Sequence, residues 1–138
     1  MFKGVKWNKS IEDIVKNAPK DCECLSLVCS NVKSMEYMSN LDNDYCKWTP
    51  QYWSTSCYYI NKKGMKKIYD LFYKEGKIDL SIKLHNYVAD DGVIYNNLIT
   101  YNYTKPTYIN KMFKSIIGSH YDYEINTHNY IKNYFENK

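Results

Sequence analysis

The stretch YYINKKGMKKI, residues 58–68, joins a run of aromatic and β-branched side chains to a candidate helix start. Residues 53–60 pass from small side chains to Tyr and Ile, a composition typical of a β-strand. Asn61 is then a favourable N-cap, because its side-chain oxygen can accept a hydrogen bond from a free amide of the first turn. The apolar residues that follow recur at intervals of three and four: Met65, Ile68, Leu71 and Phe72. We therefore predict a strand followed by a helix over residues 62–73, which Gly76 ends.

The segment before this unit predicts another helix and another strand. Ser10 can cap a helix whose first turn carries Glu12 and Asp13, two acids that complement the helix dipole. Pro19 ends that helix, because proline cannot continue the backbone hydrogen bonds. Residues 23–29, ECLSLVC, form a short run of apolar and small side chains that suits a buried central strand.

The other segments are less regular. Residues 31–50 are dense in Asn, Asp, Ser and Tyr without a clear period, which predicts a long irregular connection. Residues 78–85 fit either a strand or an extended loop. Residues 90–97 predict a short helix entered through acidic residues, and residues 99–103 predict a strand. Residues 128–135 carry the apolar spacing of a terminal helix.

Strands and helices thus alternate, which predicts an α/β fold in a single domain over residues 1–138. We expect the strands at residues 23–29, 53–60 and 99–103 to share one sheet, covered by the helix at residues 62–73. No stretch approaches the ~20 consecutive apolar residues that span a bilayer, and the N-terminus lacks the apolar segment of a secretory leader. We therefore expect a soluble protein with no membrane contact.

The charge pattern argues against a nucleic-acid-binding protein. The 19 basic residues are all lysine, and with 15 acidic residues they give a formal net charge of +4. The lysines cluster only at Lys62, Lys63, Lys66 and Lys67. Arginine, which makes bidentate contacts to guanine and phosphate, does not occur in the sequence. We interpret the cluster as a solvated helix face and expect no nucleic-acid partner.

The five cysteines form an odd set in a chain long enough to build a core without disulfides. Cys22 and Cys24 are separated by one residue, with neither a second pair nor a nearby histidine, so the pattern does not indicate a zinc site. We expect reduced thiols, a reducing compartment and no protein-bound metal.

Three segments together carry a family resemblance. They are residues 7–27, with SIEDI and LSL; residues 53–68, with YYINKKGMKKI; and residues 89–95, ADDGVIY. All three are similar to segments of glycosyltransferase family 25, in particular its divergent members from giant DNA viruses. The resemblance implies an incomplete GT-A-like, partly Rossmann-like sheet with flanking helices. It also implies a nucleotide-sugar donor, a glycan or protein acceptor, and a host cytoplasm or virion as the compartment.

One motif of that family has no counterpart in this sequence. The family carries an acidic Glu-Asp-Asp or Asp-x-Asp motif just ahead of the helix that Ser10 begins here, and this motif holds a divalent cation on the donor diphosphate. Asp90 and Asp91 do not replace it, because adjacent residues of a helix point about 100° apart. We expect the chain to lack the nucleotide-binding half of the catalytic domain. Mn²⁺ or Mg²⁺ is expected only if the acidic motif is supplied elsewhere.

The resemblance also suggests catalytic residues. Asp91 matches the family's Asp ahead of Ile94 and Tyr95, which implies a general base toward an acceptor hydroxyl, and Asp90 is the second candidate. The alternative is that both acids complement the dipole in the first turn of a helix.

Three further residues are candidates for substrate binding. Trp48 and Tyr52 flank Pro50, and aromatic rings at these positions suit the C–H face of a pyranose. Trp53 is interpreted as a core anchor instead, and Trp48 stays open between the two roles. His120 is a candidate contact to the donor phosphate, and the alternative is a surface histidine in a polar tail.

Two functions remain in view. The first is transfer of a sugar from a nucleotide-sugar donor to a protein or glycan acceptor. The second is an inactive remnant that binds a partner. Loss of the nucleotide-binding half would leave the strand at residues 23–29 with an open edge, so we expect self-association, a complementing chain, or an edge covered by residues 1–7.

Overall fold

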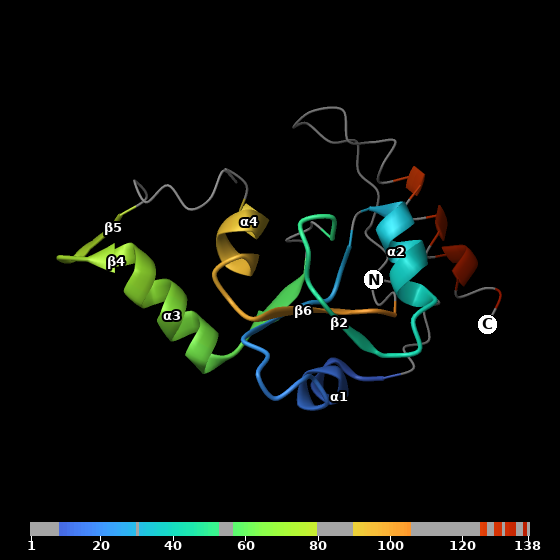
Figure 1. Ribbon diagram of the computed structural model, residues 1–138, viewed down its shortest axis with the longest axis horizontal. Coiled ribbons are helices and arrows are strands. Elements are labelled where there is room, and N and C mark those ends of the chain that lie inside the picture. Colours follow the sequence, from blue (N-terminus) through green and yellow to red (C-terminus); the bar gives the residue numbers. More distant parts are fainter. Residues whose placement is uncertain are drawn as a thin grey trace.

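The computed structural model describes residues 9–29, 31–52, 57–79, 90–105, 125–126, 129–130, 132–134 and 137. The elements in chain order are α1 (Ile11–Lys16), β1 (Cys24–Ser26), α2 (Val32–Ser39), β2 (Tyr45–Lys47), β3 (Tyr58–Ile60), α3 (Lys62–Phe72), β4 (Tyr73–Lys74), β5 (Lys77–Ile78), α4 (Asp90–Tyr95) and β6 (Thr100–Tyr103). Strands β2, β6, β1 and β3 form one mixed sheet, in that order, and β4 and β5 form a separate hairpin. The predicted combination of helices and strands in an α/β fold is therefore confirmed (Figure 1).

β1 lies inside the four-stranded sheet. It pairs in parallel with β6 and antiparallel with β3, and β2 joins the other side of β6 in antiparallel orientation. The prediction that the strands within residues 23–29, 53–60 and 99–103 share one sheet is confirmed. The expected open edge along residues 23–29 is wrong, because β1 is hydrogen-bonded on both sides. Within the described residues, the sheet edges are β2 and β3.

Side chains of the sheet alternate between two cores. Leu25 faces α1, where it packs in one cluster with Ile14. Cys24, the preceding residue of β1, faces the other side, where it packs with Tyr95 of α4 and with Leu98. This alternation follows from the two-residue period of a strand. Figure 1 shows α1 and α4 on opposite sides of the sheet.

α1 forms where the sequence predicts it. The Ser10 Oγ accepts a hydrogen bond from the Asp13 amide at 3.0 Å, the expected N-cap contact. Ile14 is the buried residue of this helix, with 1% of its surface exposed. The short helix is therefore held by its cap and by one buried apolar side chain.

The prediction of an irregular connection over residues 31–50 is wrong. This segment contains α2 and β2. Asn31 caps α2, with its side-chain oxygen accepting from the Ser34 amide at 3.3 Å, and Met35 and Met38 are buried one turn apart. Most of a short helix's stability comes from such packing, so a helix forms even though its sequence carries few apolar residues.

α3 begins at its predicted cap, but it does not cover the sheet. The Asn61 Oδ1 accepts from the Gly64 amide at 2.8 Å. The first two turns of the helix meet the sheet: an added Cβ at Gly64 would lie 2.7 Å from the Glu23 carbonyl oxygen, and Ile68 packs against the core cluster of Cys24, Tyr95 and Leu98. Met65 and Tyr69 of the same helix are each 55% exposed. Figure 1 shows α3 leading away from the sheet, so the prediction that it covers the sheet is wrong.

The end of α3 also differs from the prediction. The helix passes directly into the β4–β5 hairpin, and Gly76 lies in its turn with a φ of 79°. Glu75, the other turn residue, has a φ of 50°. Two consecutive positive φ values are typical of the tight turns that join hairpin strands. Gly76 therefore shapes a hairpin and does not end the helix. For residues 78–85, which fit either a strand or an extended loop by sequence, Ile78 lies in β5 and residues 80–85 lie outside the described part.

Several other predictions concern residues outside the described part. These are residues 1–8, 53–56 and 106–120, so the interpretation of Trp53 as a core anchor is not addressed. Of residues 128–135, the described positions 129–130 and 132–134 are helical. All five cysteines are described, and each is a free thiol. Among the described helices, none has the length and apolar character needed to cross a membrane.

Candidate ligand-binding site

Three aromatic side chains meet on the α4 face of the sheet. Tyr95, at the end of α4, lies between Trp48, just after β2, and Tyr58 of β3. Its ring centroid is 5.2 Å from that of Trp48 and 6.0 Å from that of Tyr58, and both contacts are edge-on. We call Trp48, Tyr58 and Tyr95 the aromatic cluster. It joins segments from three separate parts of the sequence.

The members of the aromatic cluster differ in exposure. Tyr95 is 1% exposed and serves as the packed centre. Trp48 is half-buried, and Tyr58 is 38% exposed. The Trp48 indole N–H donates to the Tyr52 carbonyl oxygen at 3.0 Å, and the Trp48 amide donates to the Thr100 carbonyl at 3.0 Å. These two bonds hold the backbone and the indole of Trp48 in place, and the side chain packs against two core clusters while the residue stays half-buried.

Tyr52 does not share this surface. Its side chain is 8% exposed and packs in a core cluster with Cys29 and Met38. Burial raises the pKa of its phenol above the ordinary value. The sequence pairs Trp48 with Tyr52 as two stacking rings, whereas in the structure the contribution of Tyr52 is the carbonyl that holds the Trp48 indole.

The predicted catalytic acids lie on the same element as Tyr95. Asp90 and Asp91 open α4, and Tyr95 ends it. At a rise of ~1.5 Å per residue, their backbone positions are about 6 to 8 Å from that of Tyr95 along the helix axis. Their side chains are outside the described part, and both readings of these acids, base or dipole complement, stay predictions. His120 also lies outside the described residues.

A buried carboxylate that the sequence did not single out lies near the start of β1. The Glu23 side chain is 3% exposed and accepts from the Lys63 Nζ at 2.9 Å, the Lys67 Nζ at 3.1 Å and the Ile99 amide at 3.0 Å. Burial alone would raise its pKa, but the three donors outweigh burial and bring the pKa to about 2. Glu23 is therefore an ionised anchor for α3 rather than a group that exchanges protons near neutral pH.

This anchor changes the interpretation of the lysine cluster. Lys63 and Lys67 each bridge to Glu23, and Lys66 pairs with Asp70 at 2.7 Å on the exposed side of α3. The predicted solvated face is thus also the face that fastens the helix. The sequence signal was available in principle: an acid directly before a buried strand, and two lysines four residues apart on one helix face.

The buried thiols of Cys24 and Cys29 are not poised for chemistry. Burial raises the pKa of the Cys24 thiol to about 12. Burial also raises the pKa of the Cys29 thiol, to about 11, although its hydrogen bond to the Asn31 carbonyl acts in the opposite direction. Such thiols stay protonated at neutral pH and are poor nucleophiles and metal ligands. Within the part of the chain that the structure describes, His, Cys, Asp and Glu side chains form no group of three or more that could hold a metal ion.

Comparison with known proteins adds no assignment. No family model, no curated protein and no solved structure matches this chain.

Proposed function

We propose that this chain is a glycosyltransferase-like domain, related to family 25, in which the aromatic cluster contacts a sugar of the donor or acceptor. The observation that carries the proposal is the contact between Trp48 and Tyr95. It brings a candidate sugar-stacking ring against the helix that begins with Asp90 and Asp91, the candidate bases. A mixed sheet that includes a parallel pair and has helices on both faces is compatible with part of a GT-A-like fold.

In this proposal Asp91 acts on the acceptor. The acceptor hydroxyl oxygen forms a bond to the anomeric carbon as the bond from that carbon to the diphosphate breaks. The hydroxyl proton passes to the Asp91 carboxylate, and the diphosphate leaves with the electron pair. Each step of the proposal is assigned to this chain's own residues and to the two substrates.

The experiment is isothermal titration with UDP-glucose and UDP-galactose, with and without Mn²⁺. Because the nucleotide-binding half is expected to be absent, we expect weak binding by the wild-type chain through the sugar of the donor, and an affinity at least about tenfold lower for Trp48→Ala. Tyr58→Ala, at a more exposed position of the aromatic cluster, repeats the test if Trp48→Ala does not fold. Tyr37→Ala is the matched control, because Tyr37 is an aromatic residue that is 60% exposed on α2. Absence of heat with every UDP-sugar would overturn the proposal.

The catalytic part of the proposal needs its own measurement. Asp91→Asn should retain donor binding while losing transfer to acceptor glycans, as followed by mass spectrometry of the products. If Asp91→Asn transfers sugar at the wild-type rate, the residue is a dipole complement and not a base.

A second candidate function is partner binding without catalysis. One observation favours it: the arm formed by α3 and the β4–β5 hairpin exposes several large apolar side chains. These are Met65 and Tyr69 at 55% each, Tyr73 at 40% and Ile78 at 69%. Exposed apolar residues gathered on one part of the surface, as on this arm, are typical of interaction surfaces. Wild-type chain that binds no UDP-sugar would favour this function over the first.

A further inference from the structure

Asn102 is an unexplained polar group in the centre of the sheet. It lies on β6, opposite Ser26 of β1 on one side and Cys46 of β2 on the other. Only 2% of its surface is exposed, and neither the Oδ1 nor the Nδ2 forms a well-aligned hydrogen bond within the described residues. The Cys46 thiol, a weak hydrogen-bonding group, is the polar group beside it. Buried amides in folded proteins are nearly always paired, since burial without a partner is unfavourable.

The neighbouring polar side chains do not share this deficit. On the same strand, the Thr100 Oγ1 donates to the Tyr95 carbonyl at 2.9 Å, and just after the strand the Thr104 Oγ1 donates to the Asn43 carbonyl at 2.7 Å. On β1, the Ser26 Oγ donates to the Val28 carbonyl at 3.0 Å. The lack of a partner is therefore particular to Asn102 and does not reflect a poorly packed region.

The sheet register places Asn102 beside the aromatic cluster. Tyr58, Ser26, Asn102 and Cys46 stand in one row across the four strands. The next row on this face contains Thr100, which contacts Tyr95, and Trp48 follows Cys46 by two residues and so shares its face. Asn102 thus shares a row with Tyr58 of the aromatic cluster and lies one row, about 7 Å along the strands, from Thr100 and Trp48.

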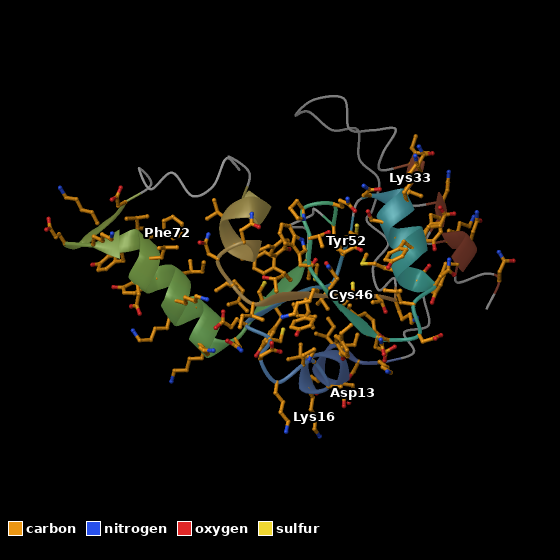
Figure 2. All side chains as sticks on the ribbon, in the orientation of Figure 1. Asp13, Lys16, Lys33, Cys46, Tyr52 and Phe72 are labelled. Atoms are coloured by element: carbon orange, nitrogen blue, oxygen red, sulfur yellow. The ribbon has the colours of Figure 1, made fainter. Side chains whose placement is uncertain are left out.

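A short loop closes this region. Trp48 packs against both the Tyr95 cluster and the Tyr52 cluster, and Cys46 packs with the latter. A turn bond from the Tyr52 amide to the Thr49 carbonyl, at 2.9 Å, and the indole bond of Trp48 hold the loop at residues 48–52. Figure 2 shows Cys46 and Tyr52 in the middle of the molecule, between α4 and α2.

We propose that the Asn102 amide is the hydrogen-bonding group of a sugar subsite, reached when residues 49–52 shift while Trp48 stays held to β6 by the hydrogen bond from its amide to the Thr100 carbonyl. The carboxamide offers one acceptor oxygen and two N–H donors, a set that matches two neighbouring hydroxyls of a pyranose. The Trp48 ring would cover the apolar face of the same sugar, so the subsite combines one stacking surface with one polar anchor. The inference rests on the proposed function and names the side chain that forms hydrogen bonds with the sugar's hydroxyls.

The test compares a variant of Asn102, in β6, with a variant of Thr104, just after that strand. Asn102→Leu removes both hydrogen-bonding atoms at similar volume, and Thr104→Val removes a hydroxyl that already has a partner. We expect Asn102→Leu to melt about 3 °C or more above the wild type, because an unpaired buried amide is lost, and to bind UDP-galactose about tenfold more weakly. Thr104→Val should melt lower and bind normally.

A measurement on the wild type makes the test independent of variant folding. The side-chain NH₂ resonance of Asn102 in a ¹⁵N correlation spectrum should shift on titration with UDP-galactose and with methyl β-galactoside. Binding by the wild type with an unmoved Asn102 NH₂ resonance, or with normal affinity in Asn102→Leu, would overturn this inference and leave the proposed function standing. A melting temperature of Asn102→Leu below that of the wild type would assign the amide to an ordered water, which also overturns it. If the wild type binds neither probe, the proposed function itself fails.

Discussion

At the scale of single residues, Glu23 and Gly64 connect the sheet to α3. The Glu23 carboxylate forms ion pairs with Lys63 and Lys67 of the helix. The backbone carbonyl of Glu23 accepts a hydrogen bond from the Asn61 amide at 3.1 Å. Gly64 lies directly against the same carbonyl. A buried carboxylate is tolerated here because both of its oxygens face hydrogen-bond donors.

Loss of the Glu23 charge should destabilise the fold in a pH-dependent way. Its folded-state pKa of about 2 is below the ordinary 4.5, so the ionised group stabilises the protein above pH 4.5 and loses that contribution as the pH falls toward 2. We expect Glu23→Gln to lower the free energy of unfolding by about 2 to 3 kcal/mol at pH 7, with the difference shrinking below pH 4.5. Urea denaturation at a series of pH values measures this.

The exposed ion pair on α3 provides the control for this prediction. The side chain of Asp70 is 54% exposed and that of its partner Lys66 is 74% exposed. Asp70→Asn breaks this contact and should change the free energy of unfolding by less than about 0.5 kcal/mol. Equal effects of Glu23→Gln and Asp70→Asn would mean that Glu23 is not an anchor.

Gly64→Ala should destabilise the protein although alanine is the better helix former. The new Cβ would meet the Glu23 carbonyl oxygen at 2.7 Å and the Ile60 Cγ2 at 2.9 Å. Moving the backbone of Glu23 to make room for the new Cβ is unfavourable. We therefore expect the free energy of unfolding to fall by about 1 to 3 kcal/mol, although the higher helix propensity of alanine contributes about 1 kcal/mol in the opposite direction. Thermal melting compared with Lys66→Ala, an exposed position of the same helix, measures the effect; a stabilised Gly64→Ala would contradict the close contact.

At the scale of elements, caps decide where the helices begin. Asn61 has two roles, because its Oδ1 caps α3 and its Nδ2 donates to the Cys22 carbonyl at 2.7 Å. We expect Asn61→Ala to cost about 1 to 2 kcal/mol, and Asn61→Asp, which keeps the cap but loses the donor, to cost less. Chemical denaturation of both variants would show the order, and a harmless Asn61→Ala would mean that packing alone fixes the start of α3.

At the scale of the whole molecule, stability is concentrated in the central strands. β1 and β6 lie inside the sheet, and α1 and α4 cover its two faces, whereas the β4–β5 hairpin is exposed. We predict that backbone amides of β1 and β6 exchange with deuterium the slowest, and those of β4 and β5 at least about a hundredfold faster. Hydrogen exchange followed by NMR tests this, and slow exchange in the hairpin would indicate that another surface covers the arm.

The same arrangement makes Leu27 a sensitive core position. Leu27 is 4% exposed and packs in the cluster beneath α1. Leu27→Ala should cost about 2 to 5 kcal/mol, whereas Ile78→Ala, at a position 69% exposed, should be nearly neutral. A loss below about 0.5 kcal/mol for Leu27→Ala, measured by denaturation, would place Leu27 outside the core.

The sequence by itself determined the local elements that carry a strong signal. Ser10 and Asn61 predicted the starts of α1 and α3, and the apolar run at residues 23–29 predicted a central strand, since caps and side-chain periodicity act over a few residues. α2 escaped prediction because Met35 and Met38 are too few to show a period, and only burial against the rest of the chain makes that helix stable.

Tertiary structure alone decided how these elements assemble and which side chains meet. The close approach of Gly64 to the Glu23 carbonyl and the pairing of Lys63 and Lys67 with Glu23 join residues 40 or more positions apart. The aromatic cluster and the unpaired Asn102 follow from the order β2-β6-β1-β3. Strand order is set by long-range packing and hydrogen bonding, so no local pattern in the sequence could place Trp48, Tyr95 and Asn102 on one face.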